Sequence, residues 1–153
     1  MHALMGLVPA GLLLAGCAGD PIVVDVRSGD LVELDDGSVV RYAGVQAPLP
    51  GDPHFETARQ KNHELVYRRK VSLVLAQPEP NDAGELVAFV YAPVEHAGKT
   101  QFLFVQGELA LWGLVQAAPA PPGLFEDVAK CQEMAKELGR GPWLPRDPAT
   151  SGR

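Results

Sequence analysis

Residues 26–48 bring together side chains that could act on a phosphate ester. The stretch reads V-R-S-G-D-L-V-E-L-D-D-G-S-V-V-R-Y-A-G-V-Q-A-P and carries Asp30 and Arg41. A carboxylate is a preferred ligand of Ca²⁺, and a guanidinium group can grip a phosphate with two hydrogen bonds. Three further aspartates near this stretch are better explained by a turn and a solvated edge: Asp25, Asp35 and Asp36.

Other kinds of catalytic chemistry are not indicated. His54 and His63 are nine residues apart, so they do not share a helix face, and no His/Cys cluster has metal-ligand spacing. No local spacing suggests a Ser-His-Asp arrangement. Cys131 falls in an apolar helical stripe, so we expect a small core residue rather than a nucleophile. Trp112 and Trp143 have apolar neighbours that favour core positions over base stacking.

Hydrophobic patterns outline the elements that must position these residues. Short β-branched or apolar runs predict five strands, at residues 22–25, 31–34, 39–45, 71–75 and 86–91. The sequence D-D-G-S at 35–38 predicts a hairpin turn. Helical spacing predicts helices over 55–69 and 124–138, and 102–112 reads as a strand followed by a short helix. The polar Asn62 interrupts the apolar face of the first helix.

This order of elements predicts a mainly β fold with helices, of the α+β class. Five strands with one helix after the third and further helices at the end are compatible with a five-stranded OB-fold Greek-key barrel carrying about three helices. A generic α+β sandwich fits the same pattern. The length of 153 residues suits one domain with short extensions.

The N-terminal segment is expected to lie outside that domain. Residues 1–15 are almost wholly apolar, and L-A-G-C at 14–17 resembles the lipobox of bacterial lipoproteins. The resemblance implies cleavage before Cys17, a diacylglycerol on its thiol, and a lipid-anchored protein of the cell envelope. Ala18 after the cysteine favours the periplasmic face of the outer membrane. The alternatives are a plain signal peptide or a buried helix, since the segment lacks Lys and Arg.

These features divide the chain into four parts: a signal peptide at 1–16, the lipidated cysteine and a tether at 17–21, a domain at 22–143, and a C-terminal tail at 144–153. Cys131 would then have no cysteine partner for an intramolecular disulfide. The net charge of −6 argues against nucleic acid as a general partner. We expect the basic run at 68–70 to be the solvated C-terminal end of a helix, where positive charge interacts favourably with the helix dipole.

Five separated pieces of sequence resemble the staphylococcal-nuclease-like family in the same order. They are the hairpin at 26–48, the helix after the proline-rich loop, G-E-L-V-A-F-V-Y at 84–91, L-A-L-W-G-L at 109–114, and A-K-E-L-G-R-G-P-W at 135–143. The resemblance covers about residues 22–143. It implies an OB-fold barrel and, in an intact member, a Ca²⁺-dependent nuclease site with two metal aspartates, two arginines and a glutamate base.

The family positions are only partly preserved in this chain. Asp30 matches a metal aspartate and Arg41 matches the first arginine, whereas the first aspartate of the family's turn reads Ser28. The other positions differ in chemistry: the second metal aspartate reads Gln46, the candidate base reads Leu49, and the second arginine reads Glu85. Each such group is worth on the order of a hundredfold or more in rate.

We therefore predict a degenerate site that does not cleave nucleic acid and needs no cofactor. The expected function is a module that binds a small ligand or a protein partner, held at the membrane through the lipid on Cys17. The alternative is a Ca²⁺-dependent nuclease that uses Asp30 and Arg41, with Glu56 or His54 supplying a base.

Overall fold

The computed structural model describes residues 20–119 and 125–140, which form a mixed α+β fold with three helices. The predicted α+β class and the three helices are confirmed. The predicted signal peptide, Cys17, Trp143 and the C-terminal tail lie outside the described residues. In chain order the elements are β1 Val23–Ser28, β2 Leu31–Leu34, β3 Val39–Tyr42, β4 Val45–Gln46, α1 Phe55–Val66, β5 Ser72–Leu75, β6 Leu86–His96, β7 Lys99–Phe104, α2 Val105–Leu111, β8 Gln116–Ala117 and α3 Phe125–Glu137.

The main sheet is mixed and open. Its hydrogen-bonded order is β1-β2-β3-β6-β5, with β7 paired to β6 outside that path. β3 runs parallel to β6, and the other pairs of this sheet are antiparallel. One isolated bridge, between Ile22 and Lys70, joins the residues that lead into the outer strands β1 and β5. β4 and β8 form a separate two-stranded sheet, so the structure has more strands than the five predicted.

Side chains along β2 and β3 alternate between the buried core and the opposite face of the sheet, where Arg41 lies. Val32 and Leu34 of β2 and Val40 and Tyr42 of β3 are buried, so the residues between them face the other way. Arg41 is one of these, and it is only half-buried. On β6 the core side is made of small residues, namely Ala88, Val90 and Ala92. α1 packs on β1, while α2 packs on α3 and β6.

Two buried polar side chains tie the helices to the sheet. Asn62 of α1, the polar exception in the predicted apolar face, accepts a hydrogen bond from the Tyr42 hydroxyl at 2.8 Å. Its amide nitrogen donates to the Ser28 carbonyl at 2.9 Å. Gln106 of α2 accepts from the Val90 amide at 3.0 Å and donates to backbone carbonyls of β6 and of the β3–β4 connection. These bonds satisfy groups that would otherwise be costly to bury.

The first helix is shorter than predicted, ending at Val66 rather than residue 69. The reason is tertiary: the Arg68 amide donates to the Val23 carbonyl at 2.9 Å, and the Val23 amide donates to the Arg69 carbonyl at 3.1 Å. Arg68 adopts a φ of 59° in doing so. Residues 68–70 are therefore a turn beside the start of β1, and not the last turn of a helix.

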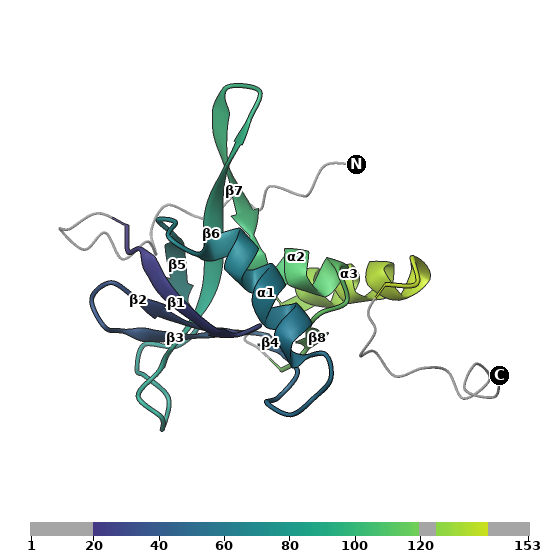
Figure 1. The fold of residues 1–153 in the computed structure, drawn as a ribbon. Helices are drawn as coiled ribbons and strands as arrows, with labels where there is room; N and C mark the ends of the chain where they lie inside the picture. Colours follow the sequence, from purple (N-terminus) through teal and green to yellow (C-terminus); the bar gives the residue numbers. More distant parts are fainter. Residues whose placement is uncertain (1–19, 120–124, 141–153) are drawn as a thin grey trace.

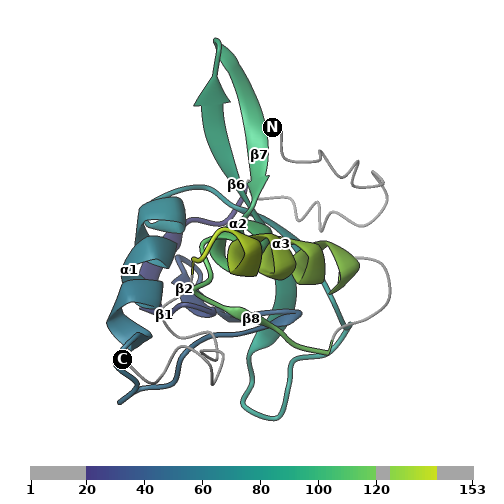
Figure 2. The same ribbon diagram turned by 90° about the vertical axis from the view of Figure 1, so that its right-hand side faces the viewer.

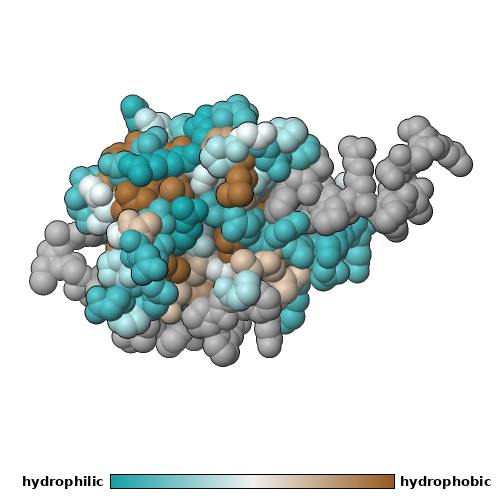
Figure 3. All heavy atoms as spheres, turned by 90° about the horizontal axis from the view of Figure 1, so that it is seen from below, coloured by the Kyte–Doolittle hydropathy of each residue, from teal (hydrophilic) through white to brown (hydrophobic). Residues whose placement is uncertain are grey.

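β6 is longer than predicted and continues into a hairpin with β7. The turn between them is Ala97-Gly98, and both residues have positive φ, at 50° and 74°. Figures 1 and 2 show this hairpin projecting from the upper end of the molecule, beyond the rest of the sheet. The opposite end, seen from below in Figure 3, is largely hydrophilic with apolar patches between. Among the described residues, no helix is long and apolar enough to cross a membrane.

Candidate functional site

Asp30 lies in the tight connection between β1 and β2 with its carboxylate turned inward. The residue is 4% exposed. Its Oδ1 accepts hydrogen bonds from the Ser28 hydroxyl at 2.7 Å and from Arg41 Nη1 at 3.2 Å, and its Oδ2 accepts from the Ala47 amide at 3.3 Å. The preceding Gly29 permits this close packing, since a Cβ there would lie 3.0 Å from the Cβ atoms of Ala47 and Ala58. Both carboxylate oxygens are thus already engaged by the protein.

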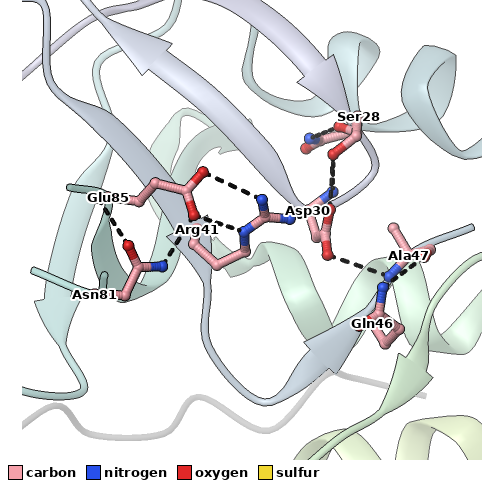
Figure 4. A network of polar contacts seen from close by, with 8 residues as sticks. Ser28, Asp30, Arg41, Gln46, Ala47, Asn81 and Glu85 are labelled. Atoms are coloured by element: carbon pink, nitrogen blue, oxygen red, sulfur yellow. Dashed lines mark hydrogen bonds and ion pairs between the residues drawn. The ribbon is translucent and has the colours of Figure 1, made fainter. Parts of the chain in front are cut away.

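Arg41 of β3 lies between two carboxylates (Figure 4). Its Nη1 donates to Asp30, while its Nε and Nη2 donate to Glu85 Oε1 and Oε2 at 3.3 and 3.2 Å. The contact with Glu85 is bidentate, which is the strong geometry for a guanidinium–carboxylate pair. Partial burial disfavours the charged form, but the hydrogen bonds that Arg41 donates to Glu85 and the charges of both acids outweigh it and raise the pKa of Arg41.

Glu85 is fixed by the loop that leads into β6. The Asn81 side chain donates to Glu85 Oε1 at 2.9 Å and accepts from the Glu85 amide at 2.9 Å, and the Asn81 amide donates to the Glu85 carbonyl. Burial opposes ionisation of Glu85, yet the hydrogen bonds from Asn81 and Arg41, with the charge of Arg41, lower its pKa. The carboxylate therefore stays charged and paired at neutral pH.

Of the other two predicted site residues, Gln46 reaches this network only through Ala47, at its edge, and Leu49 lies outside it (Figure 4). Gln46 is exposed at the end of β4, and its Nε2 donates to the Ala47 carbonyl at 3.1 Å. Leu49 is 65% exposed in the connection between β4 and α1. The structure thus brings Asp30, Arg41 and Glu85 into one network. It adds Ser28, Ala47 and Asn81 to that network.

Asn81 is the site residue that sequence reasoning missed. The sequence of residues 77–84 predicts a loop, because two prolines and Asn-Asp indicate a turn without indicating what the side chains bind. The available signal was local, since an Asn side chain commonly bonds to backbone a few residues ahead in such turns. Here the same local hydrogen bonding also places the Asn81 side-chain amide nitrogen against the Glu85 carboxylate.

The residues present do not fit a Ca²⁺ ion. Calcium takes six to eight oxygen ligands, whereas both oxygens of Asp30 and both of Glu85 accept hydrogen bonds from the protein. Gln46 directs its amide nitrogen at a backbone carbonyl. Within residues 20–119 and 125–140, no group of three or more His, Cys, Asp or Glu side chains is placed to hold a metal ion.

The residues named as alternative bases or acidic ligands do not lie in the network around Arg41. Glu56 pairs with Arg59 on α1, and the His54 amide donates to Asp52 ahead of that helix. The aspartates of the hairpin region bond locally or lie at the surface: Asp35 to the Ile22 amide, Asp36 to the Ser38 amide, and Asp25 near Arg27. None of these groups contacts the network around Arg41 among the hydrogen bonds and ion pairs of the described residues.

Two open grooves in the described part of the chain lie away from the network. One of about 320 Å³ is lined by Arg59, Gln60, His63 and Glu64. The other, of about 460 Å³, lies between α1 and the region of Trp112 and Arg140. Trp112 is 40% exposed there, so its predicted core position is wrong. Its ring lies under Lys61 Nζ and the Arg140 guanidinium, at 4.8 and 4.4 Å from the ring centroid.

Comparison of the chain with known protein families found no matching family, and comparison with curated proteins found no similar sequence.

Proposed function

We propose that this chain is a staphylococcal-nuclease-like, OB-type domain of an envelope lipoprotein. We propose further that its site does not cleave phosphodiesters and that the domain acts as a binding module for a small ligand or a protein partner. The lipid on Cys17 would hold it at the membrane, on the periplasmic face of the outer membrane.

The strand order supports the OB-type assignment. Antiparallel β1, β2 and β3 are followed by a parallel β3–β6 pair and by β5 on the far side of β6. The bridge between Ile22 and Lys70 brings the two outer strands together at one point. Along the chain, α1 falls between β3 and β5, which are the third and fourth strands of the main sheet in sequence, as the resemblance implies. A Greek-key barrel has these connections.

The bidentate contact between Arg41 and Glu85 carries the proposal that the site is inactive. A phosphate clamp needs guanidinium N–H groups that can turn to the substrate. In this chain Nε and Nη2 bind Glu85 and Nη1 binds Asp30. A second negative charge also stands where the family has its second arginine. An approaching phosphodiester would have to displace one carboxylate from Arg41 and would be repelled by both.

A cleavage assay tests this proposal. The purified protein is incubated with single-stranded DNA and with RNA, in Ca²⁺ or in chelator, and we expect no cleavage above the buffer control. Arg41→Ala and Arg27→Ala serve as a matched pair, because Arg27 is also ion-paired to acids but lies outside the network. Chelator-sensitive cleavage that Arg41→Ala abolishes and Arg27→Ala retains would establish the nuclease alternative.

A second measurement separates a binding module from a scaffold without a ligand. Extracts of envelope small molecules and proteins are passed over the immobilised wild-type chain and over an Asp30→Ala variant confirmed to be folded by circular dichroism. A ligand retained by wild type and lost in the variant supports a binding site beside the network, which Asp30 helps to hold in place. Equal retention would leave Asp30 with a role in stability alone.

A further inference from the structure

Three elements of the fold run between the same two ends of the molecule. β1 starts beside Lys70 and finishes at Ser28, next to Asp30. α1 finishes at Val66, just before the basic turn at 68–70. β6 starts directly after Glu85 and continues for 11 residues to the hairpin turn, a length of about 30 Å at the usual rise per residue. The Arg41 network and the hairpin tip are therefore at opposite ends.

The end with the hairpin carries four exposed cations that form no ion pair among the described residues. Arg68, Arg69 and Lys70 are exposed, and so is Lys99 at the start of β7. Within the described residues none of these four forms an ion pair. Most other described cations do: Arg27, Arg41, Arg59, Lys61 and Lys136. The acids nearby are Asp20, Asp35, Asp36 and Glu95, and none of them is ion-paired to these four cations among the described residues.

An exposed aromatic side chain adjoins these cations. Arg69 Nη1 donates to the Pro93 carbonyl of β6 at 3.4 Å, and Pro93 pairs across the hairpin with Phe102 of β7. Phe102 is 56% exposed. Cations beside an exposed aromatic residue are typical of surfaces that rest at a membrane interface, with the ring in the headgroup region and the charges on anionic lipids.

The chain enters the described domain at this same end. Cys17 precedes Asp20 by three residues, and three residues can span at most about 11 Å. Ile22 is bridged to Lys70, and the Val71 amide donates to the Pro21 carbonyl at 2.9 Å. Figures 1 and 2 show the start of β1 and the connection from α1 to β5 at the level of the hairpin's base, with the hairpin extending upward beyond them.

We infer that the turn Arg68-Arg69-Lys70 and the β6–β7 hairpin form a docking surface for an anionic lipid bilayer. This inference rests on the proposed lipid anchor at Cys17, whose short tether sets the surface against the membrane. Docking there directs the Arg41 network away from the bilayer, toward soluble ligands. A basic and aromatic surface could also bind single-stranded nucleic acid, but the net charge of −6 and the adjacent anchor favour lipid.

Hydrogen exchange on vesicles tests the docking surface. The full chain, made with its signal segment in a bacterial host, is reconstituted into phosphatidylcholine vesicles and into vesicles that also contain phosphatidylglycerol. Peptides over 67–71 and 92–104 are expected to exchange more slowly on the anionic vesicles than on the neutral ones. Peptides over 79–86, at the Arg41 end, should be unchanged. High salt should remove the difference without releasing the protein, because the surface contact is electrostatic and the lipid insertion is not.

Matched variants assign the effect to the basic turn. Arg68→Gln with Arg69→Gln and Lys70→Gln should abolish the protection, whereas Lys130→Gln with Lys136→Gln and Arg140→Gln, on and after α3, should retain it. Each cation near an anionic surface is worth about fivefold in binding. Equal exchange on the two vesicle types, or equal behaviour of the two triple variants, would overturn the docking surface. Binding of single-stranded RNA at the same peptides without protection by lipid would overturn it as well.

The anchor is checked separately by the mass of the peptide that contains Cys17. If that peptide carries no lipid, the proposed anchor fails, and the same chain is then sedimented with both kinds of vesicle. Salt-sensitive binding to phosphatidylglycerol that the triple variant at 68–70 weakens on the order of a hundredfold still supports the surface. Absence of such binding overturns it.

Discussion

The pair of Arg41 and Glu85 should contribute measurable coupling energy to folding. The contact has two N···O distances, 3.3 and 3.2 Å, so the charge centres are separated by about 4 Å. At an effective dielectric constant of about 20, two unit charges at that separation attract by about 4 kcal/mol, and in bulk water by about 1 kcal/mol. The Arg41 side chain is 35% exposed and Glu85 13% exposed, so solvent screens part of the attraction. We expect a coupling of about 1–2 kcal/mol.

A double-mutant cycle with Arg41→Met and Glu85→Gln measures this coupling. Gln keeps the shape of Glu85 and one acceptor for Arg41 but removes the charge. Free energies of unfolding come from urea titrations at neutral pH in low and high salt. The matched control is the exposed pair of Arg27 and Glu33, whose side chains are 45% and 31% exposed, and which should give less than about 0.5 kcal/mol.

Equal coupling energies in the two cycles would refute a strong, half-buried pair of Arg41 and Glu85. In that case Glu85 would be a surface charge near Arg41, and the guanidinium would remain available to a phosphate ligand. A coupling that vanishes in moderate salt would carry the same meaning, because an exposed pair is screened and a half-buried one is screened much less.

Three further predictions concern the same fold. The Glu85 contribution should be lost in acid: its folded pKa is lowered from 4.5, so the stabilisation is present above that value and disappears as pH falls through the folded pKa, which a pH series of urea titrations of wild type and Glu85→Gln would reveal. Tyr42→Phe should lower the free energy of unfolding by about 1–2 kcal/mol, since the buried Asn62 Oδ1 loses its donor; an unchanged urea midpoint would contradict this. Gln106→Leu should cost about 3 kcal/mol or more, because the Val90 amide and two carbonyls lose their partner, and a variant as stable as wild type would show that these groups find other partners.

The local sequence pattern is sufficient to predict elements whose buried residues recur at one regular spacing. The strand Leu31–Leu34 and the turn at 35–38 follow from apolar alternation and an Asp-Gly turn, and Gly37 has the positive φ of 87° that such a turn requires. The last helix, predicted over 124–138, is observed as Phe125–Glu137 because its apolar residues recur at helical spacing. Gly139 follows it with a φ of 64°, as expected for a C-cap.

The parts that could not be predicted depend on partners distant in the sequence. α1 ends early because residues 68 and 69 exchange backbone hydrogen bonds with Val23. The outer part of the β6–β7 hairpin has polar residues on both faces, among them Glu95, Lys99 and Gln101, so it lacks the period-2 pattern that marks a half-buried strand. The short β4–β8 pair joins residues about 70 positions apart, which local propensity cannot indicate.

The site shows the same division between local and distant causes. Its three charged members were identified from the resemblance to a family, which implied that Asp30, Arg41 and position 85 share one region. Their mutual contacts could not be deduced, because a glutamate at position 85 could equally have pointed to solvent. In the structure the Asn81 side chain sets the orientation of Glu85, because its hydrogen bonds hold the carboxylate toward Arg41.

The charges around Arg41 argue that the network is a complete structural unit rather than the remainder of a catalytic one. A site that merely lacked its metal ligands and base would leave Arg41 Nε and Nη2 without a partner and Asp30 with a free oxygen. Instead, Glu85 supplies the second carboxylate, and the Ser28 hydroxyl and the Ala47 amide complete Asp30. The network adds side-chain contacts between the β1–β2 connection, β3 and the loop before β6, at an end where the Tyr42 amide already donates to the Asp30 carbonyl and β3 already pairs with β6. A ligand of this domain should therefore bind beside the network and leave the contact between Arg41 and Glu85 intact.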